Sequence, residues 1–266
     1  MGCCSSGATR TCGASGSDQV TGATLEGVAP YVGAMKYFLA LFAVTSSLAF
    51  AAEPVSLFNG SLEGWSFKSG KGTSKWAVGP VMVHPSNPKE LIITPATIPS
   101  SAASLCNIAT KHGDSVDIYS KEKFGSCLIE LEVMVPKGSN SGIYVMGEYE
   151  VQVFDSSGKA DDKMGPGDMG AIYGAAVPKV NACRAPGEWQ RYVIEWQAPK
   201  FDATGKKIAN AKFIKVELNG KVMHENLEMP GPTPSGVTGK EAAEGPIMFQ
   251  GDHGPVAYRN IKITPR

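Results

Sequence analysis

The chain has 266 residues, of which 42% are hydrophobic, and its 25 lysines and arginines balance its 25 aspartates and glutamates. This balance gives no sign of the strongly basic surface that is typical of nucleic-acid-binding proteins, so we expect no nucleic acid as a partner. The 31 glycines and 18 prolines favour short strands joined by turns over long helices.

The first 52 residues predict an export signal. Residues 1–34 are rich in Gly, Ser, Thr, Ala and Cys, and residues 35–52 join a lysine, a short apolar run and an Ala-x-Ala end. This order is typical of a secretory signal peptide, and the interrupted run is too short to span a membrane. We expect residues 1–34 to be an upstream extension, translation to start at Met35, and a mature chain from about Glu53 that is periplasmic or extracellular. An N-myristoylation pattern at residues 1–6 is the weaker alternative, because it would place the protein on a cytoplasmic membrane face.

Residues 53–266 are expected to form a single all-β domain without an integral membrane segment. Residues 127–135 alternate most clearly, with Ile129, Leu131 and Val133 on one face. Asn219-Gly220 predicts a tight hairpin. Further strands are predicted within 55–67 and at 76–79, 90–94, 143–146, 149–156, 171–173, 189–196, 212–218, 221–224, 247–250 and 256–263. No helical apolar stripe interrupts them, so the sequence predicts a β-sandwich.

Three cysteines remain in the mature part, Cys106, Cys127 and Cys183. They lack the spacing of a metal site. In an oxidising compartment two of them could form a disulfide and the third would be left over. The alternatives are buried thiols or one disulfide, and neither gives the cysteines a catalytic role.

The strand predicted at 149–156 carries the main candidate site. Val151 and Val153 can face a core while Glu150 and Gln152 face the other way. A β-bulge after Gln152 would bring Asp155 to the same face, so that two carboxylates flank one groove, one of them with a raised pKa. Such a pair suits acid–base chemistry on a sugar. The alternative is a strand whose polar face is only solvated.

Polar and aromatic residues near glycines at strand ends supply further candidates. They are Asn140, Tyr144, Tyr173, Gln250 and His253. The two tyrosines could be platforms for a sugar ring or half-buried core residues. A lone histidine such as His253 is more often a solvated turn residue than a catalytic one.

Several motifs together resemble the 3-keto-disaccharide hydrolase family of the concanavalin-A-like lectin/glucanase superfamily. The resemblance runs through Trp65, Ser139-Asn140-Ser141-Gly142-Ile143-Tyr144, Tyr149 to Asp155, Gly170-Ala171-Ile172-Tyr173, Pro186 to Trp189, Leu218-Asn219-Gly220, Gly245-Pro246-Ile247 and Arg259-Asn260-Ile261. It covers about residues 55–266. The resemblance implies a jelly-roll sandwich and an enzyme that cleaves 3-keto-glycosides or 3-keto-disaccharides.

The implied reaction begins with removal of the C2 hydrogen, which a C3 ketone acidifies, and continues with loss of the C1 substituent and addition of water. Glu150, Asp155 and His253 are then the candidates for proton transfer. Asn140, Tyr144, Gln152, Tyr173 and Gln250 are the candidates for binding the oligosaccharide or glycoside. No cofactor is certain, and a divalent metal is one means of holding the enolate.

Two other functions stay open at this point. Laminarinase-type retaining glucanases of the same superfamily carry Glu-x-Asp-x-x-Glu, whereas this chain has Glu150, Gln152 and Asp155. The amide in place of the central acid argues against their mechanism. A non-catalytic carbohydrate-binding module would need the groove but no converging ionisable groups.

Overall fold

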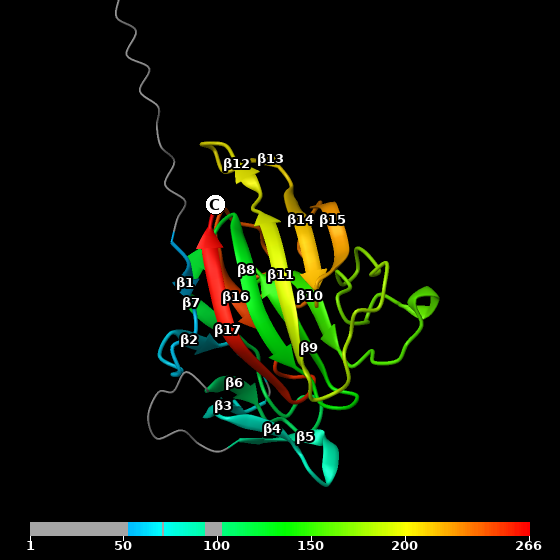
Figure 1. Cartoon of the computed structure of the whole chain (residues 1–266). Coiled ribbons are helices and arrows are strands. Elements are labelled where there is room, and N and C mark those ends of the chain that lie inside the picture. Colours follow the sequence, from blue (N-terminus) through cyan, green and yellow to red (C-terminus); the bar gives the residue numbers. More distant parts are fainter. Residues whose placement is uncertain (1–52, 71, 94–102) are drawn as a thin grey trace, which may run out of the picture. The chain divides into compact units, whose positions relative to one another are not determined.

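Two antiparallel β-sheets face each other in the computed structural model (Figure 1), which describes residues 53–70, 72–93 and 103–266. The predictions for residues 1–52 lie outside this part of the chain. The larger sheet runs in the order β15 (Lys221–Met229), β14 (Ala211–Leu218), β11 (Trp189–Gln197), β8 (Cys127–Met134), β17 (Val256–Pro265), β6 (Ser104–Asn107) and β3 (Trp76–Gly79), and β1 (Val55–Ser56) also pairs with β17.

The smaller sheet carries the strand predicted to hold the site. Its order is β10 (Tyr149–Phe154), β9 (Asn140–Val145), β16 (Gly245–Phe249), β7 (Ile118–Phe124) and β2 (Trp65–Phe67). Two hairpins lie outside the two sheets, β4 (Val81–His84) with β5 (Asn87–Ile93) and β12 (Lys200–Phe201) with β13 (Lys207–Ala209). The only helix among the described residues is the 3₁₀ turn η1 (Asp161–Lys163), so the predicted all-β jelly-roll sandwich is confirmed.

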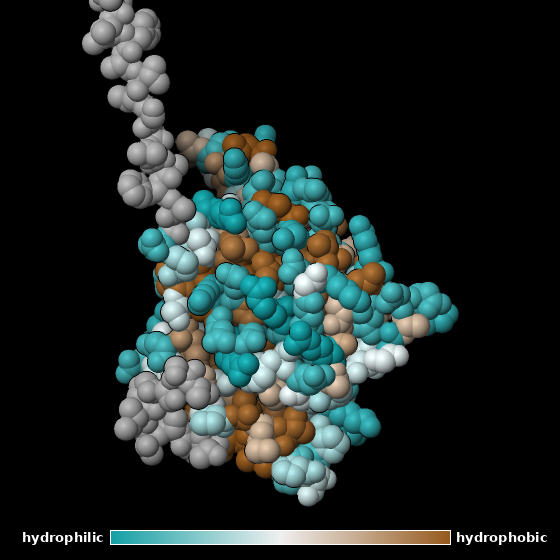
Figure 2. Space-filling view, in the orientation of Figure 1, coloured by the Kyte–Doolittle hydropathy of each residue, from teal (hydrophilic) through white to brown (hydrophobic). Residues whose placement is uncertain are grey.

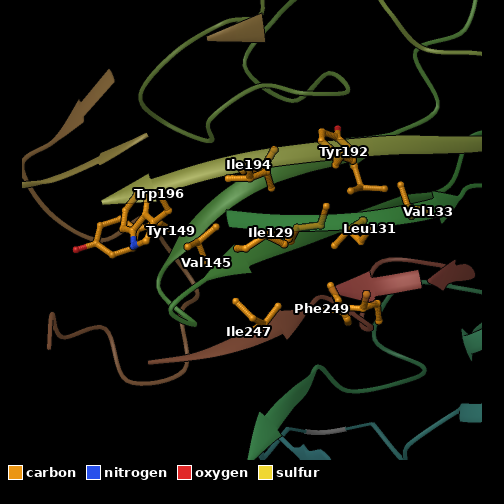
Figure 3. Packing of buried hydrophobic residues seen from close by; sticks show 14 of the residues in the cluster. Ile129, Leu131, Val133, Val145, Tyr149, Tyr192, Ile194, Trp196, Ile247 and Phe249 are labelled. Carbon is orange, nitrogen blue, oxygen red and sulfur yellow. The ribbon is translucent and has the colours of Figure 1, made fainter. Parts of the chain in front are cut away.

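Alternating apolar side chains of both sheets form the core between them (Figure 3). Ile129, Leu131 and Val133 of β8 are buried, as the sequence predicts. Aromatic pairs join the sheets. Tyr149 of β10 lies 4.6 Å from Trp196 of β11, measured between ring centroids. This packing fixes the inner face of β10 and leaves its alternate residues on the outer face of the smaller sheet.

The hairpin between β14 and β15 confirms the prediction from Asn219-Gly220. Leu218 pairs with Lys221, and the two turn residues have φ angles of 51° and 82°. Positive φ at both central positions is the geometry that Asn-Gly tolerates best and that matches the twist of the strands.

The sequence missed some strands and overestimated one. The sequence does not predict β4, β6, β7, β12 or β13. In β7 the charged run Lys121-Glu122-Lys123 breaks the alternation. The predicted strand 171–173 is an isolated bridge in which Ile172 pairs with Val151 and Ala176. This bridge nevertheless covers the free edge of β10.

The three cysteines are all free. Cys106 and Cys127 are buried, and burial raises the pKa of each thiol to about 12. Of the two alternatives drawn from the sequence, the structure therefore has buried thiols for this pair and no disulfide among the described residues.

The outer face of the larger sheet is polar, with hydrophilic side chains over β8, β11 and β17 and hydrophobic ones gathered over β4 and β5 (Figure 2). Arg259 on this face binds Glu132 at 2.8 Å and lies over the Trp189 ring at 4.0 Å. Within the described residues, no helix has the length and hydrophobicity that a membrane span requires.

Candidate active site

The outer face of β10 presents Glu150 and Gln152, as the sequence predicts. Glu150 is opposite Tyr144 of β9, and Gln152 is opposite Gly142. Val151 and Val153 are fully buried in the core. Glu150 and Gln152 are also buried, at 3% and 5% exposed, so this face is covered by loops and the solvated-strand alternative is wrong.

The predicted β-bulge after Gln152 is wrong. Pairing between β10 and β9 continues without a register shift to Phe154, where the strand ends. The carboxylate of Asp155 accepts hydrogen bonds from the backbone N–H of Gly138 at 2.8 Å and of Ser157 at 3.2 Å. Asp155 therefore holds the loop before β9 and does not line the cavity described below.

The remaining predicted site residues are brought together around one cavity of about 110 Å³. Sheet, turn and loop residues line it: Asn140, Tyr144, Glu150, Gln152, Tyr173, Pro234, Ser235, Gln250 and His253. Tyr144 is 1% exposed and forms part of the wall, whereas Tyr173 is 40% exposed at the rim. The loop after β15 contributes Pro234 and Ser235, and no sequence pattern marks either residue as part of a site.

The Glu150 carboxyl has an unusual environment. Burial raises its pKa from 4.5 to about 7, against the lowering effects of a hydrogen bond from Tyr144 and the charge of His253, while Asp117 and Asp252 raise it further. In the amide orientation that satisfies both groups, Gln152 donates to Glu150 Oε1 at 3.2 Å and to Ser141 O at 3.0 Å. A pKa near neutrality makes both protonation states available, as a general base or acid requires.

Gly142 makes room for this carboxyl. A methyl group at position 142 would overlap Glu150 Oε1. The residue facing β10 at this register must therefore lack a side chain, which explains the glycine in the Asn140-Ser141-Gly142 segment by a close approach rather than by a turn.

His253 is paired with Asp252 and lies beside a second histidine. Its Nδ1 contacts Asp252 Oδ1, and this hydrogen bond raises the pKa of His253 above its usual range, although burial acts the other way. The His112 ring stands edge-on to it, with centroids 4.4 Å apart. The sequence analysis selects neither His112 nor Asp252. For Asp252 the available signal was its position directly before the candidate His253.

The same three residues could hold a metal ion. Ligand atoms of His112, Asp252 and His253 all lie within 4.8 Å of one another. Two imidazoles and one carboxylate form a donor set that suits zinc or another divalent transition metal. The donor set fits such an ion.

Two amide oxygens in the cavity wall need a partner. Among the described residues, Asn140 Oδ1 and Gln250 Oε1 are buried and receive no hydrogen bond from the protein. Gln250 is 7% exposed. Buried acceptors are normally satisfied, so these oxygens are suited to hydroxyl donors of a ligand.

Comparisons with known proteins agree with this architecture. Residues 53–264 match the profile of the family described as the 3-keto-alpha-glucoside-1,2-lyase-like domain. One solved structure, a candidate glycosyl hydrolase from Parabacteroides distasonis ATCC 8503, is 27% identical with a TM-score of 0.56, covering 80% of this chain and 84% of that one. A second candidate glycosyl hydrolase from the same organism is 20% identical with a TM-score of 0.51, covering 80% and 100% of the two chains. No curated protein is significantly similar to this chain.

Proposed function

The chain belongs to the 3-keto-alpha-glucoside-1,2-lyase-like family, and we propose that it cleaves 3-keto-glycosides by elimination followed by addition of water. The observation that carries the proposal is the buried Glu150 carboxyl, with a pKa of about 7, in a cavity that His253 also lines. A ketone at C3 makes the C2 proton acidic enough for a carboxylate base. An ordinary glycoside offers no such proton.

Glu150 is the base in this scheme. Its carboxylate takes the C2 proton, and the electron pair is delocalised onto the C3 oxygen as an enolate. Collapse of the enolate forms a C1=C2 double bond and breaks the bond from C1 to the leaving oxygen. Water then adds its hydroxyl to C1 and a proton to C2, so the net reaction is hydrolysis.

His253 is the acid for the leaving oxygen. Its hydrogen bond to Asp252 favours the protonated imidazolium, which can donate to the departing oxygen. Where a divalent cation is required, His112, Asp252 and His253 would hold it, and it would supply positive charge for a developing oxyanion. His253 would then be a neutral ligand and would not be the proton donor. The amide oxygens of Asn140 and Gln250 accept hydrogen bonds from hydroxyl groups of the sugar.

The geometry favours this reaction over the two alternatives. A retaining glucanase needs a second carboxylate about 5 Å from the first, and Asp155 is outside the cavity, bound to backbone N–H groups. A simple binding module has no need of a buried carboxyl with a pKa near 7 beside a histidine–aspartate pair.

Purified protein should be given a chromogenic 3-keto-glucoside and the matching unoxidised glucoside. We expect turnover of the first alone, with kcat/KM rising as the pH approaches about 7, because Glu150 must be ionised. Glu150→Gln should lower kcat/KM by about 10²–10⁴-fold. Products made in D₂O should carry deuterium at C2. Sugar binding without turnover would favour the binding module, and cleavage of the plain glucoside would favour the retaining mechanism.

A further inference from the structure

A lysine behind the wall of the candidate active site is bonded to two of the segments that form that site. Lys68 comes directly after β2, and its Nζ donates to the backbone oxygen of Ser235 at 2.6 Å and to Asp117 Oδ2 at 3.3 Å. Ser235 lines the cavity that contains Glu150. The proposed reaction gives Lys68 no role.

The bond to Ser235 holds the middle of a short wall segment, residues 233–237. The backbone N–H groups of Thr233 and Val237 donate to the turn between β9 and β10 at 2.9 Å and 2.8 Å, which fixes both ends of the segment. Between these ends, Ser235 has a φ angle of 66°. A residue other than glycine keeps this left-handed conformation only where its surroundings hold it. The Lys68 ammonium supplies a charge-assisted hydrogen bond at this position.

The bond to Asp117 reaches a second part of the wall. Asp117 is 9% exposed, and its Oδ1 accepts from the backbone N–H of Gly251 at 2.9 Å. Gly251 directly follows Gln250, which lines the cavity. The backbone oxygen of Asp117 also accepts from Lys68 N–H at 2.9 Å, so these two residues are joined by backbone and side chain. One ammonium therefore ties the wall segment to the turn after β16.

We propose that Lys68 is a positioning residue, which holds the wall segment 233–237 and the turn after β16 at the separation that the substrate requires. The inference rests on the proposed function for its effect on catalysis, whereas the position of the wall can be measured without substrate. Because Lys68 contacts the back of the wall, we expect it to control how tightly the substrate is bound and not how fast the bound substrate reacts.

Three variants separate the two bonds. Lys68→Met removes both of them. Asp117→Asn keeps an oxygen that can accept from Gly251 N–H and leaves the lysine able to bind Ser235. The double variant removes the bond to Ser235 without leaving a buried carboxylate unpaired, which would by itself destabilise the fold.

Two further variants serve as controls. Lys68→Arg keeps a positively charged donor and should retain the bond to Ser235. Lys89→Met makes the same change at an exposed lysine of β5, which lies outside the two large sheets.

Amide hydrogen exchange of residues 233–239 should be measured first, on protein without substrate. We expect exchange about tenfold faster in Lys68→Met and in the double variant, as the loss of one hydrogen bond to a charged group predicts. Exchange in Asp117→Asn and in the two controls should match that of the wild type. On a 3-keto-glycoside, Lys68→Met and the double variant should raise KM about tenfold and leave kcat within about twofold of the wild-type value.

The outcomes separate this inference from the proposed function. Unchanged exchange in the double variant would overturn the role of Lys68, as would an equal increase over the whole chain, which indicates general destabilisation. Faster exchange with an unchanged KM would show that the position of the wall does not matter to the substrate. A wild-type protein that turns over no 3-keto-glycoside would contradict the proposed reaction, and the exchange rates would still decide whether Lys68 positions the wall.

Discussion

At the scale of single residues, the Glu150 carboxyl destabilises the fold that holds it. Its pKa is 4.5 when exposed and about 7 in the folded chain, where Tyr144, His253, Asp117 and Asp252 surround it. Between these values the unfolded chain loses the proton while the folded chain keeps it. Stability therefore falls as the pH rises from 4.5 to about 7 and stays at the lower level above it.

Glu150→Gln should remove this pH-dependent penalty, because the amide resembles the protonated acid and cannot ionise. We expect the variant to match the wild type near pH 4 and to exceed its unfolding free energy by about 3 kcal/mol at pH 8. Urea denaturation at the two pH values measures the difference. An equal difference at both would show that the carboxyl is not held near pKa 7.

The cysteines give a second test at this scale. All three thiols of the domain are free, and burial raises the pKa of Cys183 to about 11, close to the values of the other two. Protein that begins at Glu53 should react slowly with a thiol reagent at pH 8. Once it is unfolded without reductant, three thiols per chain should react. A single thiol under those conditions would reveal a disulfide.

At the scale of elements, the loop between β15 and β16 closes the site over the smaller sheet. The buried Glu148 carboxylate accepts from Thr238 N–H at 2.8 Å, Thr238 Oγ1 at 2.7 Å and Gly239 N–H at 2.9 Å. The backbone oxygen of Glu148 also accepts a hydrogen bond from the backbone N–H of Thr233 at 2.9 Å. These bonds place Pro234 and Ser235 over the cavity.

Glu148→Gln should loosen this loop without touching the cavity. The new amide cannot accept at its nitrogen, so at least one buried N–H is left without a partner and the unfolding free energy should fall by about 1–3 kcal/mol. We expect KM for a 3-keto-glycoside to rise more than kcat falls. Glu225→Gln is the control, since Glu225 is exposed on β15. A variant that loses kcat alone would place Glu148 in the chemistry instead.

The sequence predicts elements best where alternation is uninterrupted. In β8 every second residue enters the core. In β10 the same rule correctly places Glu150 and Gln152 on one face of the strand and Val151 and Val153 on the other. The prediction for Asp155 depended on a β-bulge after Gln152, whereas β10 ends at Phe154 without one. Alternation alone cannot show where a strand ends.

At the scale of the whole molecule, the site combines residues that are distant in the chain. Ser235 and His253 come from loops, where no periodicity marks a residue. They line one cavity with Glu150, which lies on β10, and β10, β9 and β16 are consecutive strands of the smaller sheet. The family resemblance implied the proposed reaction class, whereas the loop residues that line the cavity could be identified only from the fold.

Export remains a proposal that the sequence supports. The family match starts at residue 53, which coincides with the cleavage point expected after the signal peptide at 35–52. N-terminal sequencing of protein from the native host should find a mature chain that starts near Glu53. Residues 1–34 on the mature protein would contradict both the start at Met35 and the cleavage.

Two truncations test whether the domain begins where this proposal puts it. Val55 pairs with Ile263, Leu57 N–H donates to Ile261 O at 2.9 Å, and Leu57 and Phe58 pack against the core. A chain that starts at Glu53 keeps these contacts and should melt at the temperature of the full-length protein. A chain that starts at Asn59 loses β1 and two apolar side chains, so its unfolding free energy should fall by about 3 kcal/mol. Equal melting temperatures for the two truncations would show that β1 adds nothing to the larger sheet.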